Sequence, residues 1–279
     1  PQAAYERVVD RVLASSHYGE RWGRHWLDLA RFAESNGYEF DEPRPNAWRF
    51  RDYVIDAFNQ DKPFDRFIKE QLAGDELWPD DPQAVIATGF NLLGPDMTDA
   101  TSQVQRRQNT LDDMTDTAGL AFLGLTVGCA RCHNHKFEPI TAQDYFRMQA
   151  FFAAAEFRRD MPVADAATRA TFDKQMNAYQ QLTKPMRDRL EALEMPYREK
   201  LYRARLAKLS DADRLAHETP EEKRTPAQKE IVINTARRLV VSAKEVTAAM
   251  TKEHQAEQTR LLGELKQFDR HKPAPLPTA

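Results

Sequence analysis

Cysteine is almost absent from this sequence: only two occur in 279 residues, so no second cysteine pair exists to complete a four-ligand structural zinc site. A run of about 18 apolar residues is also missing, which excludes a membrane-spanning helix within the sequence. Neither sign of charge dominates, because 40 basic and 43 acidic side chains leave a formal net charge of −3. This balance gives no indication of a nucleic-acid partner.

Glycine and tryptophan are unevenly distributed along the sequence. Nine of the ten glycines and all four tryptophans precede Cys129, whereas Gly263 is the only glycine after residue 155. We therefore expect an all-α protein in two parts. A compact multi-helix domain should cover 1–155, and a long antiparallel helical hairpin that resembles a coiled coil should cover 156–279.

Apolar residues at helical spacing predict a series of helices in the first part, and no convincing strand. Asp65 is the expected N-cap of one helix and Gly74 its end, while Thr141 and Asp144 have the spacing of a capping box. A further helix starts at Asp81-Pro82, and the others cover 5–12, 19–32, 49–59, 104–127 and 141–152. The helix over 104–127 would place the two cysteines at its C-terminal end.

The second part is charged and periodic, with Pro185 and Pro196 expected to kink or break its first arm. Residues 210–224 are polar and form the expected turn. Thr225-Pro226-Ala227-Gln228 combines a capping box with proline at the first helical position, so the second arm should begin there and run ~60 Å to about Phe268. The alternative is a charged helix that mainly spaces domains.

Both cysteines lie in the motif Cys129-Ala130-Arg131-Cys132-His133, and C-x-x-C-H is the attachment signature of a c-type haem. Two thiols one helical turn apart can each form a thioether with a haem vinyl group, and the adjacent imidazole is placed to bind the iron as the proximal axial ligand. The motif therefore predicts covalent haem c, with Cys129 and Cys132 as its anchors and His133 as the iron ligand.

Two other interpretations of the motif stay open. A C-x-x-C pair can act as a redox dithiol, although that interpretation gives His133 no role and is usual in a βαβ context. Zinc is the second alternative, with Cys129, Cys132 and His135 as ligands, but a fourth ligand is lacking.

Further residues are candidates for contacts with a haem. Arg131 and Lys136 are candidate partners for its propionates. Met148 is a candidate for the second axial position of the iron, and His135 is a less well placed one. The remaining candidates for this position are Met97, Met114, His17 and His25. An iron without a strong sixth ligand would instead be open to small-molecule binding or catalysis.

His25 and Asp28 lie three residues apart on a predicted helix and are candidates for a histidine–carboxylate pair with a catalytic role. A buried structural histidine is the alternative for His25. Trp22, Trp26 and Trp48 are expected in the core, with the wall of a haem or sugar site as the alternative.

Four segments of the sequence resemble the planctomycete cytochrome-c-like proteins of unknown function. They are 19–31, 48–55, 70–75 and, most specifically, AFLGLTVGCARCHNHKFEPI at 121–140. The resemblance covers about residues 1–155 and extends more loosely over the helical arm. Asn134 and Glu138 stand where such proteins usually have aspartate, and this difference leaves the haem motif intact.

The resemblance implies a multi-domain, exported protein in which the arm joins the haem domain to a larger C-terminal domain. Haem c is attached outside the cytoplasmic membrane in bacteria, so we expect a periplasmic or other extracytoplasmic location and a signal peptide outside this sequence. The expected function is electron transfer, with other domains of the same polypeptide or a separate redox protein as partner. A haem-free helical scaffold and a haem-dependent oxidoreductase acting on carbohydrate are the alternatives.

Overall fold

The structure is a computed structural model that describes residues 2–37, 41–96, 102–158 and 160–278. Within these ranges the regular elements are helices, and strand-like pairing is limited to two isolated bridges, Ser35 with Pro43 and Pro162 with Thr278. The predicted all-α fold class is confirmed. No helix in the described ranges combines the length and the apolar character needed to cross a bilayer.

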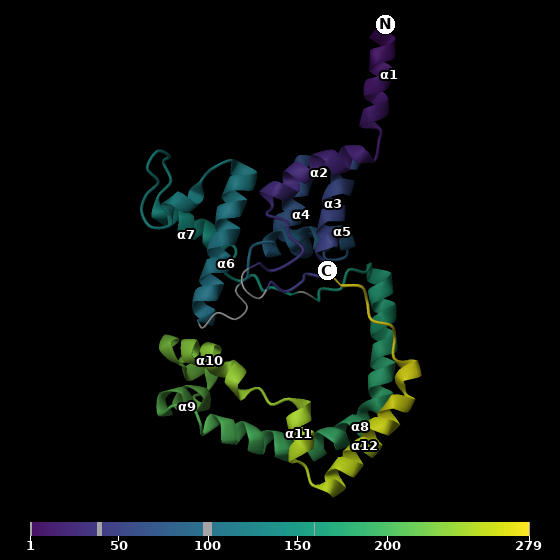
Figure 1. The fold of residues 1–279 in the computed structure, drawn as a ribbon, viewed down its shortest axis with the longest axis vertical. Helices are drawn as coiled ribbons and strands as arrows, with labels where there is room; N and C mark the ends of the chain where they lie inside the picture. The colour runs from purple at the N-terminus through teal and green to yellow at the C-terminus, as the bar shows by residue number, and fades with distance from the viewer. Residues whose placement is uncertain (1, 38–40, 97–101, 159, 279) are drawn as a thin grey trace. The chain divides into compact units, whose positions relative to one another are not determined.

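The chain divides into two compact units. The first consists of Pro1–Ala100, Gln105–Ala166 and Leu276–Ala279, and the second of Thr101–Val104 and Ala167–Pro275. The helices of the first unit, labelled in Figure 1, are α1 (Gln2–Leu13), α2 (His17–Leu29), α3 (Ala47–Asn59), α4 (Phe64–Leu77), α5 (Pro82–Ala87), α6 (Gln103–Ala118) and α7 (Ala142–Ala150). Shorter helical turns are η1 (Thr88–Leu92), η2 (Gly119–Leu123) and η3 (Val127–Ala130).

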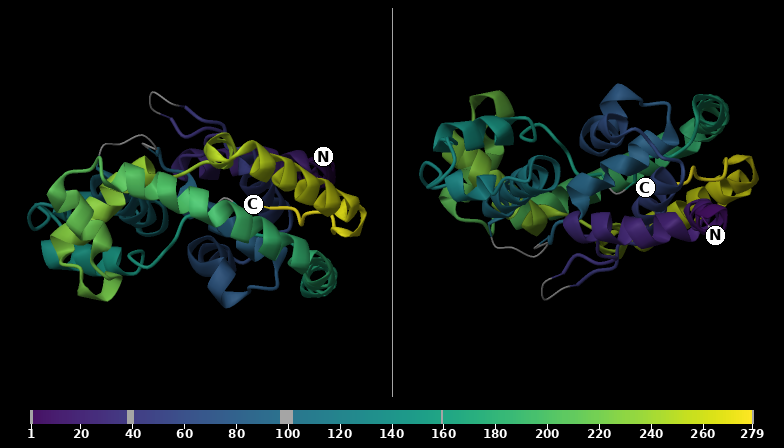
Figure 2. Two further views of the ribbon diagram at one scale, coloured as in Figure 1. Left: turned by 90° about the horizontal axis from the view of Figure 1, so that it is seen from below. Right: turned by 90° about the horizontal axis from the view of Figure 1, so that it is seen from above.

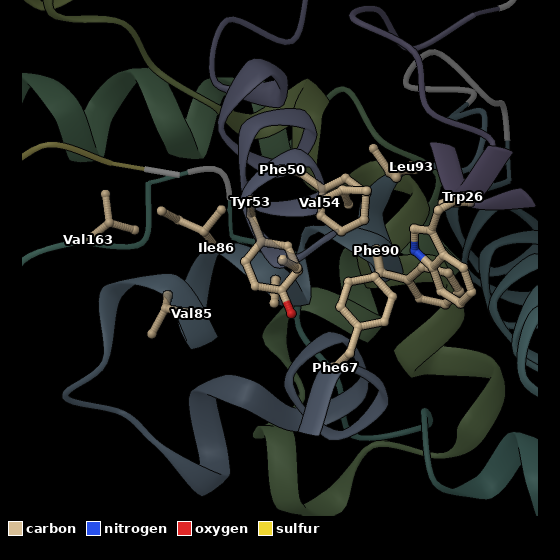
Figure 3. Close-up of a cluster of buried hydrophobic side chains, with 13 residues drawn as sticks. Trp26, Phe50, Tyr53, Val54, Phe67, Val85, Ile86, Phe90, Leu93 and Val163 are labelled. Carbon is tan, nitrogen blue, oxygen red and sulfur yellow. The ribbon is translucent and has the colours of Figure 1, made fainter. Parts of the chain in front are cut away.

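A large apolar cluster joins α2, α3, α4 and α5, and its aromatic side chains are drawn in Figure 3. The ring of Phe67 lies at its centre, 4.9 Å from the ring of Trp26 and 5.8 Å from that of Tyr53, measured between centroids. Aromatic pairs at such distances add to the free energy gained by removing the rings from water. Trp26 is buried as predicted, but Trp22 and Trp48 are 50% and 41% exposed, so the prediction that they lie in the core is wrong.

One buried carboxylate cross-links this core. Glu70 on α4 is 1% exposed and accepts hydrogen bonds from Tyr53 Oη at 2.7 Å, Lys62 Nζ at 2.5 Å and Arg66 Nε at 2.5 Å. Burial favours the neutral acid, but the hydrogen bonds from these donors outweigh it and lower the pKa of Glu70. Glu70 is therefore a paired ionised group within the core rather than an unpartnered one.

The limits of α4 differ from the predicted ones. Pro63 occupies the N-cap position, so Asp65 lies in the first turn and does not cap the helix. The helical backbone is interrupted at Ala73, with φ of −154° and ψ of 37°, next to the predicted end at Gly74, and a further helical segment then continues to Leu77. A Cβ atom at Gly74 would stand 2.0 Å from the backbone oxygen of Ala84 on α5. Glycine is needed here because the backbones of the two helices approach so closely.

The longest helix of the second unit is α8 (Ala166–Leu206), with 41 residues. Pro185 and Pro196 both lie inside it, and Figure 1 shows its axis turning along its length. The prolines therefore kink the first arm without ending it. The elements that follow are α9 (Asp211–Glu218), η4 (Glu221–Lys223), α10 (Pro226–Leu239), α11 (Ala243–Ala249), α12 (Lys252–Gln267) and η5 (Asp269–His271).

The helix α12 returns along α8 in the opposite direction, as Figures 1 and 2 show, and α11 precedes it on the returning arm. Near the middle of α8, Arg189 pairs with Glu257 of α12, with 3.3 Å between Nη2 and Oε1. Near the end of α8, Arg205 pairs with Glu245 of α11. A later residue of α8 thus meets an earlier residue of the returning chain, and this is the antiparallel arrangement that was predicted.

The returning arm is not the single helix predicted from Thr225 to Phe268. The predicted capping box of Thr225 and Gln228 is present, but the helix that it starts ends at Leu239. Ser242 then caps α11 with a second capping box, and Thr251 caps α12. Each hydroxyl satisfies a backbone N–H at a new helix start, so the chain changes direction without leaving these donors unpaired.

We expect Gly74→Ala to destabilise the first unit by about 2–3 kcal/mol, because the added methyl group forces α4 away from the backbone of Ala84. Urea unfolding followed by tryptophan fluorescence measures this, since all four tryptophans lie in the first unit. Gly263→Ala in α12 is the matched control, because nothing lies within 4 Å of its added Cβ. Far-UV circular dichroism should show that this second change stabilises its helix by about 0.5–1 kcal/mol. Equal stability of the Gly74→Ala and parent proteins would contradict the packing described for α4.

Candidate functional site

The chain leaves α6 through a turn that sets the position of the cysteine motif. After α6 the backbone widens into the π-helical turn η2, and Gly124 then takes a left-handed conformation with φ of 65°. Such a residue ends a helix, and glycine adopts this conformation without a steric penalty. The predicted helix over 104–127 therefore ends at Leu123, and the prediction that the motif lies at its C-terminal end is wrong.

The motif begins on the short 3₁₀ turn η3, which packs closely against the residues before it. A Cβ atom at Gly119 would lie 2.4 Å from the side chain of Val127, and one at Gly128 would lie 2.7 Å from the carboxylate of Asp116. Val127 and Ala130 are buried with Tyr145 of α7, and Leu125, Ile140 and Met148 pack against them. These inner contacts fix the turn, and they leave the other four side chains of the motif exposed.

Cys129, Cys132 and His133 are all exposed. The two thiols are free rather than joined in a disulfide. Both sulfur atoms are therefore accessible to a reactive group from outside the protein, as a covalent attachment site requires.

The imidazole of His133 has a defined orientation. Its Nδ1 lies 2.7 Å from the backbone oxygen of Asn134. A carbonyl oxygen only accepts hydrogen bonds, so in the neutral imidazole Nδ1 carries the proton and the lone pair is on Nε2. No hydrogen bond to Nε2 of His133 occurs among the described residues. A lone pair presented in this way is what an iron or other metal ion needs from histidine.

His135 has the opposite proton arrangement. Its Nδ1 accepts hydrogen bonds from the backbone N–H groups of Phe137 at 3.2 Å and Glu138 at 2.9 Å, so Nδ1 carries the lone pair. Nε2 then carries the proton and lies 3.2 Å from the hydroxyl of Thr126. Because both nitrogen atoms are engaged, His135 organises the loop and presents no lone pair to a metal ion.

The loop between the motif and α7 is held at both ends. The side-chain oxygen of Asn134 accepts a hydrogen bond from the backbone of Ala142 at 3.1 Å, and His135 N–H donates to the oxygen of Ile140 at 2.8 Å. The predicted capping box of Thr141 and Asp144 is present at the start of α7. Asn134 therefore has two structural roles: its backbone orients His133 and its side chain ties the loop to α7.

A buried carboxylate of α6 anchors the motif from behind. Asp112, 8% exposed, accepts hydrogen bonds from Arg131 Nη1 at 3.1 Å, Gln149 Nε2 at 2.8 Å and Gln108 Nε2 at 2.9 Å. Its negative charge raises the pKa of Arg131. The hydroxyl of Tyr145 lies 3.3 Å from the same carboxylate. One acceptor therefore connects α6, the motif and α7.

Asp116, one helical turn beyond Asp112, lies in a different environment. It contacts the backbone at Gly128, and its Oδ1 is buried without a hydrogen-bond partner among the described residues. Burial raises the pKa of Asp116, and a hydrogen bond from Tyr145 and the nearby charge of Arg131 only partly oppose this effect. A carboxylate is thus present directly beneath the turn that carries the first cysteine.

The two basic residues predicted to contact haem propionates differ in their surroundings. Arg131 is held by Asp112, whereas Lys136 is exposed and forms no ion pair with the described residues. The ammonium of Lys136 lies 5.3 Å from the ring centroid of Phe137. Lys136 is therefore the more available partner for an external anion.

Large apolar side chains beside the motif are unusually exposed. Leu123 just before it is 59% exposed, Phe137 just after it is 82% exposed, and Phe146 on α7 is 48% exposed. Exposed apolar groups that gather near one segment are typical of surfaces that bind something. The sequence identified these residues as apolar but gave no sign of their exposure.

The other predicted site residues lie apart from this arrangement. His25 is exposed, with Nε2 2.8 Å from Arg21 Nη1, and Asp28 is also exposed, so the alternative of a buried structural histidine is not what the structure shows. Met148 packs against the small cluster behind the motif.

Three further candidates for the second axial position have varied surroundings. Met114 is 2% exposed in the interior of the first unit. His17 is exposed, and its hydrogen bond to Glu20 raises its pKa. Met97 lies outside the described residues.

The fold and the site define a class: an all-α protein that presents a C-x-x-C-H turn on its surface. Residues 1–157 match the family described as PSCyt2, protein of unknown function (DUF1549). Because this match covers more than half of the chain, the chain belongs to that family. No curated protein and no solved structure matches the chain.

We expect Asp116→Asn to stabilise the first unit at pH 7 by on the order of 1 kcal/mol, because burial disfavours the charged carboxylate more than the hydrogen bond from Tyr145 and the charge of Arg131 favour it. The folded protein holds the Asp116 proton to a higher pH than the unfolded chain, so stability falls as the pH rises from the ordinary pKa of 3.8 through the raised native value. The extra stability of the Asp116→Asn variant should therefore disappear at a pH below 3.8, where Asp116 is protonated in both the folded and the unfolded parent protein.

Urea unfolding at two pH values, followed by tryptophan fluorescence, measures the effect of Asp116→Asn. Asp113→Asn is the matched control, because Asp113 forms an ion pair with Arg31 at 2.6 Å and its loss should destabilise the protein. A decrease in stability for Asp116→Asn at pH 7 would show that the hydrogen bond from Tyr145 and the charge of Arg131 outweigh the cost of burying this carboxylate.

Proposed function

We propose that the first unit carries a covalently attached haem c and transfers electrons within a larger exported redox protein. The observation that carries this proposal is the arrangement of two exposed free thiols beside an imidazole whose Nδ1 is tied to the backbone. A haem of this type supplies reversible one-electron exchange when it is bound. The family match supports the proposal only in part, because it shows membership of a family whose function is unknown.

The residues present fit such a group. Each thiol of Cys129 and Cys132 would add across one vinyl double bond, with sulfur bonding to one carbon and the thiol proton passing to the other, so no oxidant is required. His133 would ligate the iron through Nε2. The hydrogen bond from Nδ1 to Asn134 orients the ring and makes Nε2 a better electron donor.

The proton arrangement of His135 favours haem over zinc. A zinc site built from Cys129, Cys132 and His135 needs a lone pair on His135, but Nδ1 of this residue already accepts two backbone hydrogen bonds. Recruiting His135 would leave the N–H groups of Phe137 and Glu138 without their acceptor. His133 requires no such rearrangement.

The surroundings of the motif match the needs of an amphipathic macrocycle. Lys136 is the favoured partner for a propionate, because Arg131 is already held by Asp112. Leu123, Phe137 and Phe146 offer apolar surface at the same segment. An exposed motif also suits electron transfer, because a redox partner or a further domain of the same polypeptide can approach the group closely. Because haem c is attached outside the cytoplasm, the proposal implies a periplasmic or other extracytoplasmic location.

Export of this chain in bacteria that have a haem c attachment system tests the proposal. We expect a Soret band that survives acid–acetone extraction and a mass increase equal to one haem. The variant with both Cys129→Ala and Cys132→Ala should lack covalent haem, because no sulfur remains to form a thioether. His133→Ala should lose the absorption spectrum of the parent protein, because the proximal ligand is removed.

His135→Ala is the matched control for His133→Ala. It should keep the covalent haem and its spectrum but destabilise the first unit by about 1 kcal/mol, because it removes the acceptor of two backbone hydrogen bonds. Colourless exported protein with the mass of the bare polypeptide would overturn the proposal and leave the helical scaffold. A spectrum that is lost in His135→Ala but kept in His133→Ala would show that His135, and not His133, is the axial ligand.

A further inference from the structure

A cavity of about 400 Å³ lies in the first unit, and none of its lining residues comes from the C-x-x-C-H turn or the loop after it. Its walls come from the start of α3, the segment after η1, the middle of α6 and Phe157. The volume falls within the ~300–1,000 Å³ typical of small-molecule sites. The cavity is therefore large enough for an organic molecule and separate from the proposed haem site.

One side of the cavity is apolar and continuous with the core. Phe50, Ile86 and Leu93 line the cavity and also belong to the large apolar cluster. Gly89 lies beside them, and a Cβ atom there would stand 3.4 Å from the ring of Phe50. This side is rigid and suits the apolar body of a ligand.

The acidic residues at the cavity are already neutralised. Asp96 forms two hydrogen bonds of 2.6 Å with Arg106, one to Nε and one to Nη2. Asp113 forms an ion pair of 2.6 Å with Arg31. Neither carboxylate is therefore left to repel an anion that enters the cavity.

Arg49 lines the cavity and has no counter-ion among the described residues. Its guanidinium lies over the ring of Trp48, 4.5 Å from the centroid, and its Nε is buried without a hydrogen-bond partner. No ion pair or hydrogen bond of the Arg49 side chain occurs in the part of the chain that the structure describes. Arg44 at the same wall donates instead to Asn36 Oδ1 at 2.9 Å and to the backbone oxygen of Gly94 at 2.6 Å.

We propose that this cavity binds an organic carboxylate with an apolar body. Arg49 receives the carboxylate, because its planar fork matches two carboxylate oxygens and its buried N–H lacks an acceptor. Phe50, Ile86 and Leu93 receive the apolar body. The inference does not depend on the proposed haem function, since the two sites share no residue.

Isothermal titration calorimetry with two matched probes tests this inference on the purified chain. The probes are 1-naphthylacetate and its neutral isostere 1-naphthylacetamide. We expect the carboxylate to bind one site per chain at least about tenfold more tightly than the amide, because a charged hydrogen-bonded pair is lost in the amide. Arg49→Met should reduce carboxylate affinity to that of the amide and leave amide affinity unchanged.

Two further variants locate the site. Arg51→Met is the matched control, because Arg51 lies on the same helix but pairs with Glu34 and Asp52, and it should leave both affinities unchanged. Thr110→Phe fills the cavity from α6 and should abolish binding of both probes. Circular dichroism checks that each variant is folded. If Arg49→Met does not fold, Arg49→Lys, which keeps the charge, replaces it. Arg49→Lys should still bind the carboxylate more tightly than the amide, but more weakly than the parent protein does.

Several results would overturn the inference. Absence of saturable 1-naphthylacetate binding would do so, as would equal affinity for the carboxylate and the amide. Carboxylate binding that persists unchanged in folded Arg49→Met or Thr110→Phe would place the site elsewhere. None of these results would affect the haem proposal, which is tested by absorbance and mass.

Discussion

The carboxylate of Asp112 is the constraint on which the arrangement of the candidate site depends. It is buried on α6 and accepts hydrogen bonds from Arg131 in the motif and Gln149 on α7. The exposed side chains of the motif have little packing of their own, so their positions follow from the backbone that this carboxylate holds. A buried acceptor with several donors is well satisfied and enforces one geometry, whereas the loss of any one donor would leave it only partly paired.

Two histidines separated by a single residue perform different tasks because their hydrogen-bond partners differ. His133 donates from Nδ1 to a carbonyl oxygen, and His135 accepts at Nδ1 from two backbone N–H groups. The second arrangement stabilises the loop that supplies the carbonyl oxygen to the first. The orientation of His133 as a ligand therefore depends on His135, which could become a ligand itself only by giving up the hydrogen bonds that hold the loop.

The sequence predicted those features that depend on local chemistry. The helix starts at Asp81, Thr141 and Thr225 were predictable because a cap needs only residues within one turn. The end of the helix before the motif was not predicted, because apolar periodicity continues past Gly124 and hides its left-handed conformation. The breaks after Leu239 and at Met250 contain neither glycine nor proline, and the capping-box spacing of Ser242 and Glu245 was the local signal that could have located the first of them.

The candidate site was predictable only in its covalent part. C-x-x-C-H fixes the order of two thiols and an imidazole, and the structure places all three at the surface. The anchoring of Arg131 by Asp112 joins residues 19 positions apart, and the contact of Gln149 with Asp112 joins residues 37 positions apart. Contacts at such separations depend on how α6 and α7 pack, which no local pattern specifies. The cavity beside Arg49 is likewise formed by residues spread from 44 to 157.

The division of the returning arm into α10, α11 and α12 also affects its dynamics. Each of these helices has its own side-chain cap at its N-terminus, so the backbone hydrogen bonds of one do not continue into the next. A continuous helix loses its hydrogen bonds by fraying from its two ends, but a segmented arm has interior ends as well. Amide hydrogens of the second unit should therefore exchange with solvent in separate groups, with boundaries near residues 240 and 250. One of these helices can therefore open while its neighbours stay folded.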